Sequence, residues 1–185
     1  MSGVWRRQFV RRRHPIRAEA VGAVRNGLLL ALTGVSMAAV IVLIAVFLVT
    51  FAFQTGHNPG QSMSPTFKDG QRVLVNKMVY RSSQPRRGDV VMLYYPLNPG
   101  KMIIKRLIAE EGDTIQIEDG RVILNNMPQQ EPYVSPEFRS HENYGPQVIA
   151  EGYCFVMGDH RNNSSDSRHW GLVPKLYIVG RVSAW

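Results

Sequence analysis

This sequence of 185 residues is poor in cysteine, and it lacks two common signatures of metal and nucleotide binding. Its one cysteine, Cys154, cannot form an internal disulfide, and its apolar surroundings indicate a buried structural thiol more than a nucleophile. No Cys and His residues have the spacing of a zinc site, and there is no GxxxxGKS or GxxxxGKT phosphate loop. We therefore expect no metal and no cofactor.

Charge is absent from a long stretch near the N-terminus. No Asp, Glu, Lys or Arg occurs from Asn26 to Gly56, and residues 28–53 are almost wholly apolar. A bilayer core requires about 20 such residues, and a helix of this run would be about 39 Å long. The apolar region of a cleavable signal peptide is only about 7–15 residues long and ends at small residues. This run ends in bulky ones, so we expect an uncleaved membrane anchor.

Basic residues are concentrated before the apolar run. Residues 1–25 contain seven arginines and one acidic residue, Glu19, so they carry +6 of the net charge of +8. Such an arm could bind nucleic acid, but beside a membrane span we expect contact with membrane lipid and no nucleic acid. The positive-inside rule predicts a single-pass protein of the plasma membrane with a cytoplasmic N-terminus and an extracytoplasmic C-terminal domain. The predicted parts are a basic arm, a transmembrane helix and an outer domain, at residues 1–25, 26–54 and 55–185.

The outer domain has the composition typical of β-strands. Short runs rich in β-branched and aromatic residues alternate with Pro and Gly, and they occupy residues 72–80, 89–95, 101–109, 152–159 and 176–185. Residues 113–126 resemble a hairpin about an Asp-Gly turn. Residues 127–152 are polar and predict a long excursion from the sheet. We expect a mostly β fold, an antiparallel β-sheet catalytic domain on a single N-terminal transmembrane helix.

A single lysine lies within one of these apolar runs. On a strand, Ile103, Lys105 and Leu107 share a face, so the Lys105 ammonium is expected to lose its water. Burial lowers the pKa of a lysine, and a neutral lysine amine can take the proton from a serine hydroxyl. Such a Ser–Lys pair needs no histidine. The alternative is a surface lysine that extends its charge to solvent from an edge strand.

Two other places concentrate polar residues. Ser62 and Ser64 lie in a turn region with Gly60 and Pro65, and a dense polar loop covers residues 158–171. Either serine on its own is explained as a turn residue that hydrogen-bonds nearby backbone. The order of the sequence motifs along the chain, described next, indicates a function for these serines.

Five motifs occur in a fixed order behind the anchor. They are SMSPTF at 62–67, RRGDVVML at 86–93, KRLIAEEGDTI at 105–115, EPY at 131–133 and GDHRNNSSDSRHWG at 158–171. Together they resemble the motifs of the bacterial type I signal peptidases, also called leader peptidases, over essentially the whole outer domain. The resemblance implies a membrane-bound serine endopeptidase that removes N-terminal signal peptides from exported preproteins, its partners. It also implies small residues, in an Ala-x-Ala pattern, before the cut.

The resemblance implies a role for each matching residue. Ser62 is the expected nucleophile, Lys105 the general base and Ser164 the residue that orients the lysine amine. Ser64 remains a turn residue. Four charged residues are expected to support the polar loop, Asp166 and Arg168 as an ion pair: Asp159, Arg161, Asp166 and Arg168.

The resemblance also implies where a substrate lies. An extended peptide is expected to add as a strand between residues 57–60 and the strand that leads to Lys105, with Pro59 and Gly60 in contact with it. A shallow apolar pocket for a small side chain is expected from four residues: Met63, Phe67, Ile103 and Ile104. Gly60 stands where some members have a serine that donates to the oxyanion, so the Ser62 N–H is the expected donor here. His160 replaces the usual Asn, which we interpret as a structural substitution.

Two other interpretations remain open. Self-cleaving repressors share this catalytic fold, but they are cytoplasmic and carry a DNA-binding domain, whereas residues 28–53 predict an anchor. An inactive or narrow-specificity peptidase-like protein on the same scaffold is the other alternative. Loss of Ser62 or Lys105 would have indicated an inactive protein, and both residues are present.

Overall fold

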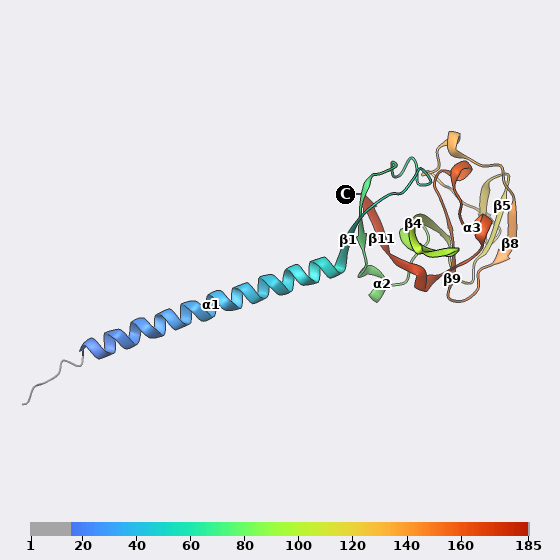
Figure 1. The fold of residues 1–185 in the computed structure, drawn as a ribbon. Coiled ribbons are helices and arrows are strands. Elements are labelled where there is room, and N and C mark those ends of the chain that lie inside the picture. The colour runs from blue at the N-terminus through green and yellow to red at the C-terminus, as the bar shows by residue number, and fades with distance from the viewer. Residues whose placement is uncertain (1–15, 185) are drawn as a thin grey trace, which may run out of the picture. The chain divides into compact units, whose positions relative to one another are not determined.

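The computed structural model describes residues 16–184, and the side chains from residue 21 onward. Residues up to Leu48 and residues from Val49 form separate compact units. The described part of the first unit is residues 16–48 of helix α1 (Ile16–Ala52), of which Val21–Ala52 is long and apolar enough to cross a membrane (Figure 1). Of the predicted basic arm, residues 1–15 lie outside the described part of the chain, and helix α1 already includes residues 16–25.

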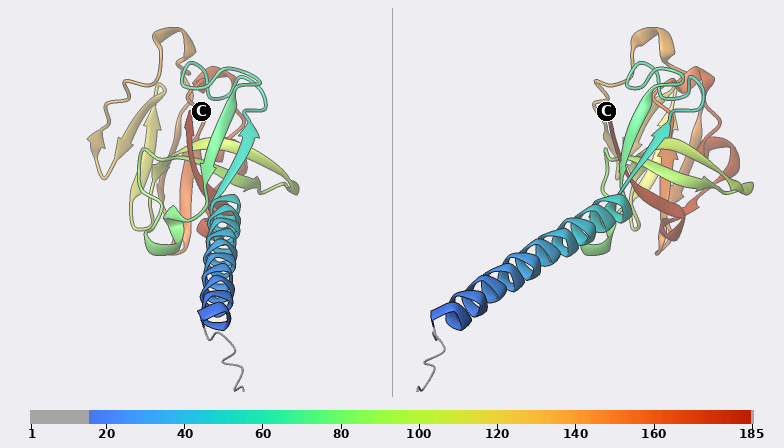
Figure 2. Two further views of the ribbon diagram at one scale, coloured as in Figure 1. Left: turned by 90° about the vertical axis from the view of Figure 1, so that its left-hand side faces the viewer. Right: turned by 60° about the vertical axis from the view of Figure 1, so that its left-hand side comes forward.

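The second unit contains two antiparallel sheets. The larger sheet has the strand order β1-β2-β11-β3-β4-β9-β10. Its strands are β1 (Phe53–His57), β2 (Arg72–Asn76), β3 (Val90–Tyr95), β4 (Asn98–Ala109), β9 (Tyr153–Met157), β10 (Val173–Pro174) and β11 (Ile178–Ala184). The smaller sheet has the order β7-β6-β5-β8. Its strands are β5 (Thr114–Glu118), β6 (Arg121–Leu124), β7 (Met127–Pro128) and β8 (Tyr144–Val148), and β5 and β8 lie at the far end of the domain from β1 (Figures 1 and 2).

The remaining elements are short. They are α2 (Val79–Ser82), η1 (Pro136–Phe138), η2 (Arg161–Asn163), α3 (Ser167–Trp170) and η3 (Lys175–Tyr177). The prediction of a mostly antiparallel β fold behind one apolar helix is confirmed. The predicted hairpin is also confirmed, since β5 and β6 pair around Asp119 and Gly120, whose φ angles are both positive as a tight hairpin turn requires.

Three predictions of local structure were wrong. Phe53 and Gln54 do not extend the helix but begin β1, which pairs with β2 from Phe53↔Asn76 onward. The strand predicted at 72–80 ends at Asn76, because the Asn76 side chain accepts the backbone N–H groups of Met78 and Val79 and turns the chain into α2. The excursion at 127–152 is not wholly outside the sheets, since it supplies β7 and β8.

The apolar core is divided into three clusters around strand β4. One lies beneath the turn that holds Ser62 and includes Met63, Val73, Val75, Met92 and Ile104. A second, with Val91, Leu93, Leu107, Cys154 and Val156, joins the middle strands of the larger sheet. The third connects the two sheets and includes Ile108, Ile115, Ile117, Phe155 and Met157. Cys154 is fully buried, in agreement with the interpretation of its thiol as structural.

Candidate active site

Lys105 lies on β4, opposite Val91 of β3, and is 4% exposed. Its Nζ atom donates a hydrogen bond of 3.1 Å to the Ser164 hydroxyl. Burial lowers the pKa of Lys105 from 10.5 to about 8, and the nearby Arg168 lowers it further while Asp166 acts in the opposite direction. The amine is therefore far closer to its neutral form at physiological pH than an exposed lysine.

Ser62 and Ser164 meet at Gly158. A Cβ atom added to Gly158 would lie 2.2 Å from the Ser164 Oγ atom and 2.4 Å from the Ser62 carbonyl oxygen. The two oxygens can therefore be no farther apart than the sum of these distances, 4.6 Å. Glycine is required here because any side chain would push the two serine segments apart. The half-buried Ser62 hydroxyl forms no hydrogen bond to Lys105 in the described part of the chain.

A short turn presents Ser62. The Ser64 N–H donates to the Gln61 carbonyl oxygen at 2.9 Å, and the Phe67 N–H donates to that of Met63 at 2.9 Å. The buried Asn58 side chain donates to the carbonyl oxygens of Gly60 and Lys68 and so joins both ends of the turn. Asn58 was not predicted from the sequence, although a polar residue directly before Pro59 and Gly60 is a usual signal of a turn.

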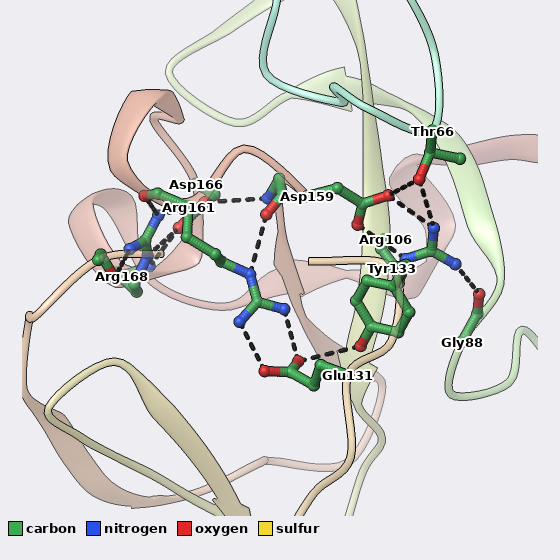
Figure 3. Close-up of polar contacts among 11 residues, drawn as sticks. Thr66, Gly88, Arg106, Glu131, Tyr133, Asp159, Arg161, Asp166 and Arg168 are labelled. Carbon is green, nitrogen blue, oxygen red and sulfur yellow. Dashed lines mark hydrogen bonds and ion pairs between the residues drawn. The ribbon is translucent and has the colours of Figure 1, made fainter. Parts of the chain in front are cut away.

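A buried ion pair lies beside the turn, formed by Arg106 and Asp159 (Figure 3). The Arg106 Nε and Nη2 atoms lie 2.8 and 2.6 Å from the two carboxylate oxygens of Asp159. The Thr66 hydroxyl donates to Asp159 at 2.5 Å, and Arg106 Nη1 donates to the Gly88 carbonyl oxygen at 2.9 Å. No role for Arg106 was predicted from the sequence. Its signal was a second charge within an apolar strand, which requires a buried partner.

Arg161 has a different partner, Glu131. Its guanidinium forms two hydrogen bonds, of 2.8 and 2.5 Å, with the two carboxylate oxygens of Glu131, and its Nε atom donates to the Gly158 carbonyl oxygen (Figure 3). The Tyr133 hydroxyl donates to Glu131 at 3.0 Å, and the Arg106 guanidinium lies 4.0 Å from the Tyr133 ring centroid. The EPY motif thus connects both arginines.

Asp166 and Arg168 form the predicted ion pair. The Arg168 Nε and Nη2 atoms lie 2.8 and 2.9 Å from the Asp166 carboxylate, which also accepts the Gly158 N–H at 3.0 Å. Burial alone would raise the pKa of Asp166, but the Arg168 guanidinium and these hydrogen bonds lower it overall. The pair therefore holds Gly158, where the two serines meet.

The residues predicted to contact substrate are not all in one place. Met63 (0% exposed), Phe67 and Ile104 are buried together in one core cluster, whereas the half-buried Ile103 packs on the cluster of the other face. Pro59 is exposed. The Gly60 N–H donates to Asp69 at 2.8 Å. The apolar pocket stays a prediction. Met63, Phe67 and Ile104 are buried, so they could form only the floor of a pocket whose open side is covered by a bound peptide.

Two further features of the described residues bear on the site. No three His, Cys, Asp or Glu side chains among them are grouped to hold a metal ion. A cavity of about 650 Å³ is lined by residues 119–121, 128–132, 134 and 139–141, and Arg161 is the one predicted site residue among the described residues that line it.

A family model described as signal peptidase, peptidase S26, matches residues 32–185. The chain belongs to this family. Signal peptidase I of Leptolyngbya laminosa is 35% identical over 159 residues, covering 80% of this chain and 76% of the relative. Signal peptidase I T of Bacillus subtilis is 36% identical over 148 residues, covering 75% and 76%.

Two other matches were found to this member of the signal peptidase family. Thylakoidal processing peptidase 1 of Arabidopsis thaliana is 38% identical over 133 residues, covering 66% of this chain and 38% of that one. A crystal structure of a signal peptidase I from Enterococcus faecalis matches 55% of this chain and 98% of that chain, with 27% identity and a TM-score of 0.48. Family membership makes the chain a hydrolase, a serine endopeptidase, and its apolar helix fits a membrane-anchored one.

Proposed function

We propose that this peptidase removes N-terminal signal peptides from exported preproteins with Ser62 as nucleophile and Lys105 as general base. One observation carries the proposal: a buried lysine with a pKa of about 8 is hydrogen-bonded to Ser164, which lies against the Ser62 backbone. A buried amine close to neutrality is the group that a serine hydroxyl needs as a proton acceptor.

The first chemical step forms the acyl-enzyme. Neutral Lys105 accepts the Ser62 hydroxyl proton as the oxygen attacks the scissile carbonyl carbon. The negative charge on the carbonyl oxygen is stabilised by the Ser62 backbone N–H, and one such donor is typically worth about 3–4 kcal/mol. Ser164 accepts a hydrogen bond from the Lys105 amine and so directs the amine toward Ser62.

The second step releases the products. The Lys105 ammonium gives its proton to the leaving amine, which is the new N-terminus of the mature protein. Neutral Lys105 then takes a proton from water as the water attacks the ester carbonyl carbon. The Lys105 ammonium returns this proton to the Ser62 oxygen as the C–O bond breaks, which frees the signal peptide and regenerates both the Ser62 hydroxyl and the neutral amine. Each proton moves between Lys105 and a reacting atom, so no second titrating residue is required.

The supporting ion pairs explain why these groups hold their positions. Arg106 and Asp159 fix the Ser62 turn through Thr66, and Asp166 and Arg168 fix Gly158. Preorganised groups lower the barrier because the site does not have to rearrange when charge develops. None of these charges is proposed to exchange a proton with substrate.

The proposed substrate is an extended peptide with small side chains before the cut. It would hydrogen-bond the backbone near residues 57–60 and place a small residue over Met63 and Ile104, which leave no open depth for a large side chain. An Ala-x-Ala sequence satisfies this requirement. We also propose that the N-terminus is cytoplasmic and the peptidase domain extracytoplasmic, because residues 1–25 carry seven arginines.

The direct test uses full-length protein in detergent and a preprotein with an Ala-x-Ala site. The wild-type protein should cut after the second alanine, Ser62→Ala and Lys105→Ala should abolish cleavage while remaining folded, and a bulky residue directly before the cut should block it. Wild-type activity in either variant would exclude the dyad. An inactive wild-type protein would favour the alternative of a binding protein on the same scaffold.

A further inference from the structure

We propose that His160 is a positioning residue that sets the direction of the Ser62 backbone N–H. This inference rests on the function proposed above, in which that N–H stabilises the oxyanion. It changes the interpretation of His160 from a simple replacement of Asn to a group that acts through the nucleophile turn.

His160 contacts the peptide groups on both sides of Ser62. Its backbone N–H donates to the Ser62 carbonyl oxygen at 3.1 Å. Its ring Nδ1 atom lies 3.2 Å from the Gln61 carbonyl oxygen. A carbonyl oxygen only accepts hydrogen bonds, so the Nδ1 atom must carry the proton in this contact. A single residue thus holds the two carbonyl groups that flank the nucleophile.

The contact with Gln61 determines where the Ser62 N–H points. The Gln61 C=O and the Ser62 N–H belong to one planar trans peptide group, so they point in opposite directions. The Gln61 oxygen accepts from His160 and also from the Ser64 N–H at 2.9 Å, which occupies both of its lone pairs. With the oxygen held by two donors, the N–H on the other side of the plane cannot rotate freely.

That N–H is available to a substrate. Within residues 16–184, the Ser62 N–H forms no hydrogen bond, whereas the Gly60 N–H is already bonded to Asp69. A donor to the oxyanion must have no other hydrogen-bond acceptor and must point at the oxyanion. The Ser62 N–H fulfils the first requirement, since it has no acceptor among the described residues. The His160 ring contributes to the second requirement, the direction of the N–H, by holding the Gln61 carbonyl oxygen.

The ring itself is held from the other side by Phe138. The two ring centroids are 3.9 Å apart with an angle of 32° between the planes. Phe138 ends η1, which lies between strands β7 and β8 of the smaller sheet, and the neighbouring Glu137 carbonyl oxygen accepts from the Asn162 side chain at 3.0 Å. Packing from a distant segment therefore fixes the ring that fixes the Gln61–Ser62 peptide.

Two substitutions of His160 separate its hydrogen bond from its packing. His160→Asn places an N–H donor at the same number of bonds from Cα as Nδ1 but removes the ring that packs on Phe138. His160→Phe keeps a ring against Phe138 and removes the donor. Both retain the backbone N–H that donates to Ser62. The matched control is His141→Ala, since the His141 side chain is 83% exposed and its Nδ1 atom lies 2.6 Å from the exposed carboxylate of Asp119, away from the nucleophile turn.

The test measures kcat and KM for cleavage of an Ala-x-Ala preprotein by each full-length variant in detergent. We expect His160→Phe to lower kcat at least about tenfold with KM changed less than about twofold, because the oxyanion forms only after substrate binds. His160→Asn should keep kcat within about threefold of the wild-type value. The inhibition constant of a peptide aldehyde, whose adduct with Ser62 places an oxygen in the oxyanion site, should rise in proportion to the loss of kcat.

The outcomes distinguish this inference from the proposed function. If the wild-type protein and the His141→Ala variant cleave and His160→Phe cleaves equally well, the positioning role is wrong and the peptidase function stands. Equal losses of kcat in His160→Phe and His160→Asn, with an unchanged aldehyde constant, would overturn it as well, because a packing role explains them. If the wild-type protein does not cleave, the proposed function itself fails. Should His160→Phe be unfolded by near-ultraviolet circular dichroism, His160→Ala replaces it under the same criteria.

Discussion

The Lys105 amine and the Ser164 hydroxyl form a 3.1 Å hydrogen bond between two buried side chains that are 59 residues apart in the sequence. The partner of the lysine is neutral, so no hydrogen-bonded group among residues 21–184 restores the charge that burial disfavours. An acidic partner at the same distance would have raised the lysine pKa and removed its basicity. The neutral Ser164 hydroxyl accepts a hydrogen bond from the amine without raising its pKa in this way.

Replacement of Ser164 by Ala should therefore reduce activity without abolishing it. The loss of one orienting hydrogen bond is worth about 1–1.5 kcal/mol, so we expect kcat to fall about tenfold. The exposed neighbour provides a matched control, since Ser165→Ala removes the same hydroxyl from a position outside the contact. Cleavage rates of the two variants decide the matter, and a Ser164→Ala rate equal to that of Ser165→Ala would remove the orienting role.

The rate of cleavage should rise with pH as Lys105 loses its proton. With a pKa of about 8, the fraction of neutral amine increases about tenfold per pH unit below that value and then levels. We expect kcat/KM, measured between about pH 6 and about pH 10, to have an acidic limb with a midpoint near 8. A midpoint near 6 would instead indicate a histidine as the base.

Replacement of Lys105 by Met should give an inactive but more stable protein at neutral pH. The folded-state pKa of Lys105 is lowered, so its desolvation penalty is fully present below about pH 8 and disappears as the pH rises toward 10.5. At about 1.4 kcal/mol per pKa unit, the gain is at most about 3.5 kcal/mol. Denaturant unfolding of both proteins at about pH 7 and about pH 10 measures it, and an advantage that grows with pH would contradict the assignment.

Breaking the Arg106–Asp159 pair should be costly, because its side chains are 10% and 0% exposed. Asp159→Asn leaves a buried guanidinium without its counter-charge, so we expect the free energy of unfolding to fall by about 3–5 kcal/mol. The more exposed pair of Arg87 and Asp113 offers the comparison, and Arg87→Ala should cost less than about 1 kcal/mol. Equal losses in the two variants would show that burial does not determine the value of the Arg106 pair.

Orientation in the membrane is open to a separate test. Protease added to intact spheroplasts should remove the peptidase domain if the seven N-terminal arginines keep that end in the cytoplasm. A protected C-terminal domain would reverse the proposed orientation. The same digestion after detergent lysis is the control, because it exposes the domain in either case.

The strands were predictable because their signal is local. The alternation of apolar residues in 89–95, 101–109 and 113–126 places β3 to β6 within a few residues of their observed bounds. The start of β1 was not predictable in this way, since Phe53 continues the apolar run of the helix and only its pairing with Asn76 shows that it is a strand. The end of β2 depends on a side-chain hydrogen bond, which periodicity does not report.

The site residues also differ in whether their signal is local in the sequence. Lys105 stood out because a charge in an apolar strand is a local anomaly, and Ser62 and Ser164 followed from the resemblance of their motifs. The partners that hold them were missed, because Asp159 lies 53 residues from Arg106 and Glu131 lies 30 residues from Arg161. Pairing between charges so far apart depends on which strands become neighbours, and no single segment of sequence contains that information.

The meeting of Ser62, Lys105 and Ser164 around Gly158 has a consequence for how the protein fails. Each of the three side chains comes from its own stretch of chain, so under the proposed mechanism a proteolytic fragment that lacks the Ser62 or the Lys105 segment should have no turnover. Loss of cleavage on heating should therefore coincide with loss of the tertiary fold. The remaining cleavage activity would then report the fraction of protein that is still folded.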